Sequence, residues 1–155
     1  MAERILARER LAAVIEADRR AGLTIAFANG IFDLLHVGHV RYLQAAAAEG
    51  DRLLVAVNGD AAAAEKGPGR PILPAAARAE LVAAIRGVSY VTIFDEPTVT
   101  ELLTLLKPDV HCKGTDYTID TVPERETVRA YGGRIAIVGD PKAHSTRDLL
   151  ARIRG

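Results

Sequence analysis

The stretch that decides the fold is residues 24–39, which read Thr-Ile-Ala-Phe-Ala-Asn-Gly-Ile-Phe-Asp-Leu-Leu-His-Val-Gly-His. Residues 24–28 form a short, mostly apolar run, which predicts a buried strand. Asn29-Gly30 marks a turn directly after that strand. Residues 37–49 are rich in alanine and are followed by Gly50, a pattern that predicts a helix with a glycine stop. The segment is therefore a strand, a loop and a helix, the repeating unit of an α/β protein.

The same alternation continues along the chain. Further strands are expected at residues 52–57, 90–94, 109–112 and 134–138, and further helices at 3–20, 75–86, 97–106, 122–131 and 145–154. This order predicts a Rossmann-like, doubly wound, mostly parallel sheet of five strands with helices on both faces. Ligands of such sheets bind beyond the carboxyl ends of the strands. We expect an N-terminal helix within residues 1–22 and a single domain over residues 23–155.

Composition narrows the class of protein. The chain has 155 residues, enough for one core, and 20 Lys and Arg balance 20 Asp and Glu. That balance argues against general nucleic-acid binding, which requires a basic surface, but it permits a small basic site for a phosphorylated ligand. The single cysteine, Cys112, forms no internal disulfide and fits a reducing compartment. No apolar run is long enough for a signal core or a membrane span, so we expect a cytoplasmic protein.

Two histidines dominate the segment between the first strand and the first following helix. His36 and His39 are three residues apart and therefore share one side of a first helical turn. Gly38 removes a side chain between them, and a helix N-terminus directs N–H groups and positive partial charge at an anion. Gly30 permits a tight turn at the same place. The pattern predicts a phosphate site with two imidazoles; the alternative is a purely structural pair at a helix end.

Phe32-Asp33-Leu-Leu-His36-Val-Gly38-His39 resembles the His-x-Gly-His signature of the cytidylyltransferase-like nucleotidyltransferases. Over residues 24–153 the chain is similar to the adenylyltransferase domain of bacterial ADP-heptose synthesis, in its stand-alone form without a kinase. The segments that carry this similarity are, in order, Gly50–Asp60, Gly69-Arg70-Pro71, Arg78, Lys113–Tyr117 and Ser145-Thr146. Thr115 stands where the pattern has a second glycine, and Arg147 where relatives often have a threonine.

The resemblance implies transfer of AMP from ATP to D-glycero-D-manno-heptose 1-phosphate, with release of pyrophosphate. It also implies Mg²⁺ carried with the NTP, no protein-built metal site, and a homo-oligomer. Alternatives within the family are cytidylyl or guanylyl transfer to glycerol phosphate or another sugar or alcohol phosphate. A nucleotide-sensing module without turnover is an alternative from another class.

The resemblance also implies roles for individual residues. The catalytic set is His36, His39 and Lys66. The nucleotide-binding set is Asn29, Gly30, Ile31, Phe32, Gly38, His39, Lys113, Gly114, Asp116, Ser145 and Thr146. The set that binds the acceptor substrate is Asp33, Asn58, Asp60, Arg70 and Arg78.

Each role has a plainer alternative. Lys66 and Arg70 lie in a loop, residues 66–71, whose two glycines and two prolines predict flexibility, and its charges can simply face solvent. Arg78 can be an ordinary exposed helix arginine. The alternatives for Asp33, Asn58 and Asp60 are turn chemistry, and for Ser145 and Thr146 helix capping. His111 and Cys112 are expected to be core residues rather than zinc ligands, and His144 a loop residue.

Overall fold

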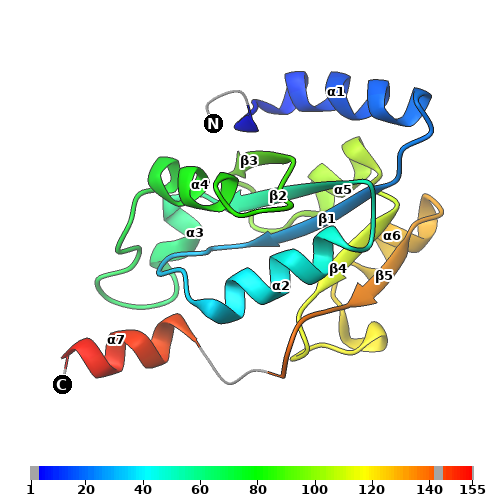
Figure 1. Ribbon diagram of the computed structural model, residues 1–155. Coiled ribbons are helices and arrows are strands. Elements are labelled where there is room, and N and C mark those ends of the chain that lie inside the picture. Colours follow the sequence, from blue (N-terminus) through cyan, green and yellow to red (C-terminus); the bar gives the residue numbers. More distant parts are fainter. Residues whose placement is uncertain (1–3, 142–144, 155) are drawn as a thin grey trace.

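The computed structural model describes residues 4–141 and 145–154, and it contains a five-stranded parallel sheet with helices on both faces (Figure 1). The strands are β1 (Ile25–Gly30), β2 (Arg52–Asn58), β3 (Tyr90–Phe94), β4 (Val110–Lys113) and β5 (Arg134–Ile137). Their order is β3-β2-β1-β4-β5, and every paired register is parallel. The expected fold class is confirmed. The loop position predicted for His144 lies outside the described residues.

Seven α-helices and one short 3-10 helix accompany the strands in the described part of the chain. They are α1 (Arg8–Arg20), α2 (Val37–Ala47), α3 (Asp60–Ala64), α4 (Ala75–Ala83), α5 (Thr100–Leu106), η2 (Ile119–Thr121), α6 (Arg125–Ala130) and α7 (Thr146–Arg154). Helices α3 and η2 were not expected from the sequence. Within the described ranges, none of the helices has the length and apolar character needed to cross a membrane.

The first helix begins later than the sequence pattern suggested. We expected a helix from residue 3, but α1 starts at Arg8. The residues before it run along the sheet, where the N–H of Leu6 donates to the carbonyl of Val91 at 2.8 Å and Ile5 forms a bridge with Val91. This segment gains a backbone hydrogen bond from the edge strand β3, and that long-range contact overrides the local helical pattern.

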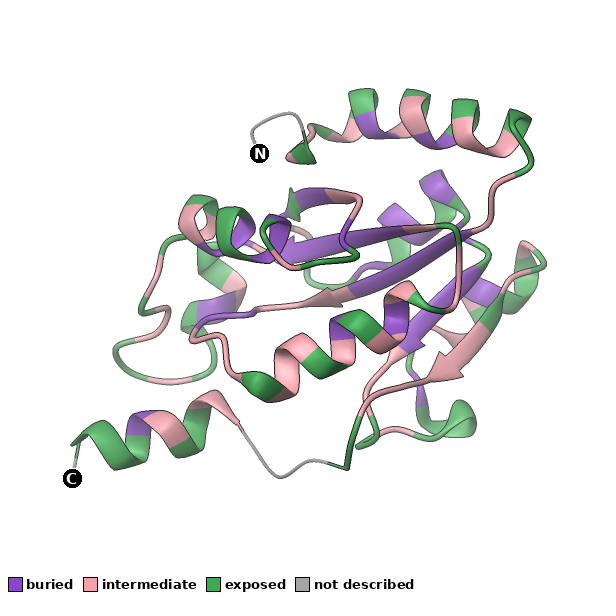
Figure 2. Ribbon diagram, viewed as in Figure 1, coloured by how far each residue is buried: buried purple, intermediate pink, exposed green. Residues whose placement is uncertain are grey.

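The sheet separates two apolar layers, because side chains alternate between its faces along each strand. On one face, Ala26 and Val55 pack with Leu43 of α2 and Val82 of α4. On the other face, a second cluster forms beneath α1, α5 and α6. Its members include Phe27, Leu54, Leu11 and Leu103. The central strands are buried along most of their length (Figure 2), so the carboxyl edge of the sheet is a rigid support for a site.

Strand β1 lies at the point where the strand order changes direction. It pairs with β2 along its whole length, from Ile25 to Gly30. On its other side it pairs with β4 only at Ala26–Val110 and Phe27–His111. Beyond those pairs the two strands separate, and parallel sheets bind ligands at such a switch point.

Candidate active site

The N-terminus of α2 is built by its two histidines. His36 is the N-cap residue, and its Nδ1 accepts a hydrogen bond from the Gly38 N–H at 3.1 Å. The Nδ1 of His39 accepts from the His36 N–H at 3.3 Å. These contacts satisfy backbone donors that a helix end otherwise leaves without partners. A neutral imidazole whose Nδ1 accepts a hydrogen bond carries its proton on Nε2, so each ring presents Nε2–H as a donor.

The two rings converge as the sequence pattern predicted. Their centroids are 3.9 Å apart and their planes differ by 26°, so the rings are stacked. The ring of Phe32 packs edge-on against His39 at 5.5 Å. Gly30 leaves room for this packing, since a Cβ there would lie 3.0 Å from the Phe32 ring and would require the ring to shift. Both histidines line a large cavity at the carboxyl edge of the sheet.

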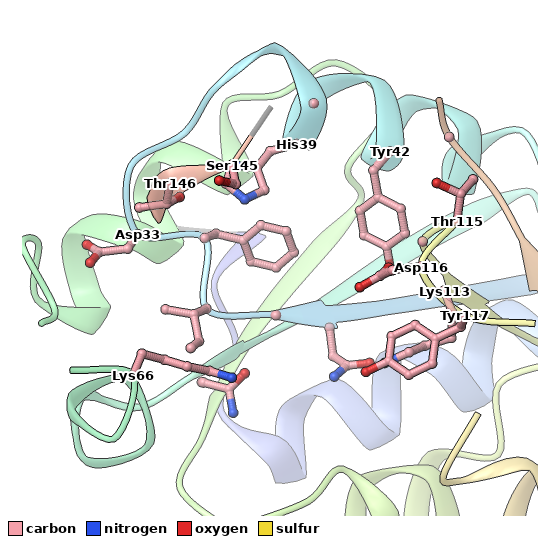
Figure 3. A pocket seen from close by; sticks show the side chains of 18 of the residues that line it. Asp33, His39, Tyr42, Lys66, Lys113, Thr115, Asp116, Tyr117, Ser145 and Thr146 are labelled. Carbon is pink, nitrogen blue, oxygen red and sulfur yellow. The ribbon is translucent and has the colours of Figure 1, made fainter. Parts of the chain in front are cut away.

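A cavity of about 1100 Å³ opens beyond the carboxyl ends of the strands. Segments that follow all five strands contribute to its wall, as expected for a parallel sheet. Figure 3 shows His39 and Tyr42 reaching toward the cavity from α2, with Lys66 on the opposite side. Cavities that hold drug-sized ligands have volumes of about 300–1000 Å³, so this cavity is at or just above the upper end of that range. Of the predicted site residues, only Asp60 and Arg78 are absent from its wall.

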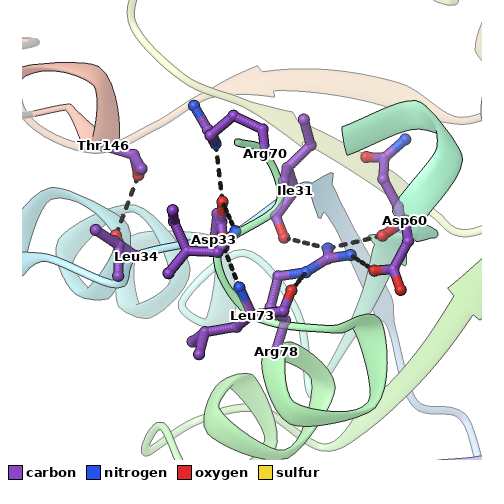
Figure 4. Close-up of polar contacts among 10 residues, drawn as sticks. Ile31, Asp33, Leu34, Asp60, Arg70, Leu73, Arg78 and Thr146 are labelled. Atoms are coloured by element: carbon purple, nitrogen blue, oxygen red, sulfur yellow. Dashed lines mark hydrogen bonds and ion pairs between the residues drawn. The ribbon is translucent and has the colours of Figure 1, made fainter. Parts of the chain in front are cut away.

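Asp33 connects the histidine segment to the loop that precedes α4. Its buried carboxylate accepts hydrogen bonds from the N–H groups of Ile72 and Leu73, at 2.8 and 3.0 Å, and from Arg70 Nε at 2.8 Å (Figure 4). Burial alone raises the pKa of Asp33, but these donors outweigh it and hold the pKa below its usual value. Asp33 was expected to bind the acceptor substrate, and it lines the cavity; its described contacts anchor one end of the loop that carries Arg70.

Arg78 was expected to contact the substrate, but it does not line the cavity. The guanidinium is fully buried. Its Nε donates to the Leu73 carbonyl at 2.9 Å, and its Nη1 donates to the carbonyls of Ile31 and Asn58, each at 2.7 Å. Nη2 donates to Asp60 Oδ1 at 2.7 Å (Figure 4). Arg78 therefore holds together the loops that follow β1 and β2. Asp60 belongs to the same support, because its carboxylate faces Arg78 and not the cavity.

Lys113 and Tyr117 lie at the end of β4. The Lys113 ammonium is 4.5 Å from the centroid of the Tyr117 ring, within the range of a cation–π contact. Burial lowers the pKa of Lys113, and the carboxylates of Glu124 and Asp116 act against that effect. The Tyr42 hydroxyl donates to the Cys112 carbonyl at 2.6 Å and so ties α2 to β4.

The two positions where the chain departs from the family pattern both line the cavity. Thr115 Oγ1 donates to the carbonyl of Asp140 at 2.9 Å, and the Asp140 carboxylate pairs with Arg41 at 3.0 Å. Thr115 thus joins the loop after β4 to the segment after β5. Arg147, at the start of α7, also lies in the cavity wall.

Helix α7 contacts the histidine segment through its first turn. Thr146 Oγ1 donates to the Leu34 carbonyl at 3.1 Å, and Ser145 Oγ accepts from the Asp148 N–H at 3.0 Å. Ser145 is therefore an N-terminal cap, the plainer of its two expected roles. Both hydroxyl residues also line the cavity, next to His39 in Figure 3, so a capping role and ligand binding are compatible.

Several wall residues were missed from the sequence. They include Tyr42, Glu65, Phe94, Thr98, Glu124 and Val138. Tyr42 follows His39 by three residues and so shares its helix face, while Thr98 comes soon after a predicted strand; both signals were in the sequence. Glu124 had no local signal. Its Oε1 is buried without a hydrogen-bond partner in the described part of the chain, which makes it an acceptor for a ligand hydroxyl or amine.

The parallel sheet, the cavity at its switch point and the stacked histidines at a helix N-terminus agree with the nucleotidyltransferase class that the sequence resembles. The chain belongs to the cytidylyltransferase-like family, whose sequence model matches residues 27–148.

The relatives of this chain include much longer proteins. The bifunctional protein HldE of Syntrophotalea carbinolica is 45% identical over 97% of this chain, and that of Gluconobacter oxydans is 46% identical over 92%. The chain spans 31% and 30% of the lengths of these two relatives. Among solved structures, a lipopolysaccharide core biosynthesis protein from Thermoplasma volcanium is similar with a TM-score of 0.68 and 27% identity. That match covers 78% of this chain and 100% of the other.

Proposed function

We propose that this protein transfers AMP from ATP to D-glycero-D-manno-heptose 1-phosphate, forming ADP-heptose and pyrophosphate. The observation that carries this proposal is the stacked pair His36 and His39 at the α2 N-terminus, in the wall of a cavity of about 1100 Å³. The choice of a heptose phosphate rests on the sequence resemblance to ADP-heptose synthesis. Relatives named HldE and a structural neighbour from lipopolysaccharide core biosynthesis support it.

The proposed chemistry is a single in-line displacement. A phosphate oxygen of the acceptor forms a bond to the α-phosphorus of ATP, and the bond from that phosphorus to the bridging oxygen breaks. Pyrophosphate leaves with the bond electrons. Such a transfer depends on positioning and on stabilising charge rather than on a protein nucleophile. The Nε2–H groups of His36 and His39 and the α2 N-terminus supply hydrogen bonds and positive potential to the α-phosphate.

The acceptor is proposed to bind on the side of the cavity opposite the nucleoside. Arg70, held by Asp33 through Nε, directs the rest of its guanidinium toward a phosphate oxygen, which suits paired hydrogen bonds. Lys66 adds a second positive charge from the same loop. Asn58, at the end of β2, lies in the same cavity wall and offers an amide to sugar hydroxyls.

A divalent ion, Mg²⁺, is expected to accompany the triphosphate. Across residues 4–141 and 145–154, no group of three or more His, Cys, Asp or Glu side chains is arranged to hold a metal ion. We expect the ion to be ligated mainly by phosphate oxygens and water, as Mg²⁺ usually is in nucleotide sites. Bound there, the ion would neutralise charge on the triphosphate.

The test is pyrophosphate release by the purified chain with ATP, CTP, GTP and UTP, each paired with heptose 1-phosphate or glycerol 3-phosphate. Turnover with ATP and the heptose phosphate is expected to exceed every other pair. Turnover only with CTP or GTP would overturn the adenylyl assignment. Tight nucleotide binding without turnover would instead support a sensing module. The predicted homo-oligomer is tested on the same sample by sedimentation velocity.

A further inference from the structure

His111 is a buried polar residue that the proposed chemistry does not use. It lies on β4 opposite Phe27 of β1, in the last register pair before the two strands separate. Its side chain is fully buried, with its ring edge-on to the Phe27 ring at 5.4 Å. Its Nε2 is 3.0 Å from Oδ1 of Asn29, and its Nδ1 is buried without a hydrogen-bond partner among the described residues.

The protonation state of His111 follows from its surroundings. Burial, with a smaller contribution from the Lys113 charge, lowers the pKa of His111 to about 3. The ring is therefore neutral near neutral pH and carries one N–H. Because Oδ1 of Asn29 only accepts hydrogen bonds, that proton lies on Nε2. The reverse arrangement would leave a buried Nδ1–H without an acceptor, and orphaned donors are rarer in proteins than under-satisfied acceptors.

This contact fixes how the Asn29 amide is oriented. The carbonyl oxygen faces His111, so the Nδ2 amino group is the part of the amide that remains for a ligand. Asn29 lines the cavity at the end of β1. Its backbone is held as well, because it hydrogen-bonds to the Tyr42 hydroxyl, which also bonds to the Cys112 carbonyl. Two bridges thus cross the gap between β1 and β4, one to the backbone of Asn29 and one to its side chain.

We propose that His111 is a positioning residue, which holds the Asn29 amide so that its amino group donates to an oxygen of the bound nucleotide. In the ligand-free protein, an amide that could flip would spend part of its time with the carbonyl oxygen toward the cavity, and an anionic ligand would then have to select the amino orientation at a cost in affinity. His111 removes that second orientation. The proposal rests on the proposed function in taking a nucleotide as the ligand. If the His111 ring only filled the core, a folded variant without that ring would bind the nucleotide with unchanged affinity.

The first experiment is a double-mutant cycle read out by calorimetry of ATP binding. His111→Leu replaces the ring with an apolar side chain of similar size that cannot donate a hydrogen bond to Asn29. We expect it to weaken ATP binding about tenfold, which corresponds to the loss of one hydrogen bond to a charged group. His111→Gln can donate to Asn29 Oδ1 and should restore most of the affinity. In an Asn29→Ala background, His111→Leu should have no further effect, because the group through which it acts is gone.

Two results of this cycle would overturn the proposal. One is an equal loss of affinity from His111→Leu with and without Asn29. The other is a folded His111→Leu protein with the affinity of the wild type.

A second experiment needs neither a variant nor a ligand. Long-range ¹H–¹⁵N spectra of the wild-type protein report which ring nitrogen of His111 carries the proton. Protonated Nε2 and unprotonated Nδ1 are expected, and an Nδ1–H tautomer would contradict the proposal even if His111→Leu failed to fold. If the wild type bound no ATP, the proposed function would fail on its own, while the tautomer would still decide whether His111 orients Asn29.

Discussion

Asp33 and Arg70 form a nearly buried ion pair, with 2.8 Å between Oδ2 and Nε, that joins the histidine segment to the loop before α4. The Asp33 side chain is 0% exposed and that of Arg70 is 11% exposed. Since Asp33 lies three residues before His36, the loop and the paired histidines share one anchor. The sequence predicted a flexible loop over residues 66–71, and the structure shows that its last turn is fixed at Arg70.

Removing the charge of Asp33 should loosen this anchor. In Asp33→Asn, one amide oxygen replaces a carboxylate that accepts from two backbone N–H groups and Arg70, so at least one buried donor loses its partner. We expect the free energy of unfolding to fall by roughly 2–4 kcal/mol, measured by urea denaturation. KM for the acceptor should rise as well, because Arg70 is no longer held. As a control, Glu126→Gln removes an exposed ion pair with Arg129 and should cost less than about 1 kcal/mol.

Arg78 should act on stability rather than on ligand affinity alone. Arg78→Met fills much of the same volume but leaves the carbonyls of Leu73, Ile31 and Asn58 without their donor. A loss of about 3 kcal/mol or more is expected in urea denaturation. Arg78→Lys should recover little of it, because one ammonium cannot reproduce the planar fork of donors. Unchanged stability with a selective loss of nucleotide binding would return Arg78 to the ligand-binding role that the sequence suggested.

His39 should affect turnover far more than folding. His39→Ala removes one Nε2–H donor from the phosphate site, and removal of such a donor commonly lowers kcat by about 10²–10³-fold. Because the rings of His36 and His39 stack, the double variant should lose less than the product of the two single losses. Val37→Ala is the matched control, since Val37 is 42% exposed on the same helical turn. Near-normal turnover in folded His39→Ala would refute the proposed role.

The sheet could be predicted from sequence because its strands are short apolar runs, a signal that is contained in the local sequence of each strand. Residues 52–57 were expected as a strand, and β2 covers Arg52–Asn58. The start of α1 could not be predicted in the same way. Ile5 and Leu6 fit an amphipathic helix and an edge contact with Val91 equally well, and only the long-range hydrogen bond decides between them.

The residues of the candidate site also differ in whether the local sequence predicts their position. Residues at or beyond the carboxyl ends of strands, such as Lys113 and His36, could be placed at the cavity because parallel strands end at one edge of the sheet. Arg78 could not be placed, because the alanines around it do not show which helix face is buried. The role of His111 in orienting Asn29 was equally hidden, since the two residues are 82 positions apart.

His111 should also make the folded state sensitive to acid. In the unfolded chain its pKa is near the ordinary 6.5, whereas burial lowers the folded-state pKa to about 3. At pH values below the unfolded-state pKa, the unfolded chain therefore binds a proton that the folded chain does not. The free energy of unfolding decreases as the pH is lowered, until the pH approaches the folded-state pKa. Between about pH 7.5 and about pH 5, this linkage removes about 2 kcal/mol from the wild type. His111→Gln does not titrate and should lose that much less over the same interval, when urea unfolding is compared at the two pH values. Equal losses in both proteins would mean that His111 keeps its ordinary pKa in the folded state and becomes charged there as the pH falls to about 5. Its hydrogen bond to Asn29 would then have a different origin, because a charged ring would carry protons on both nitrogens.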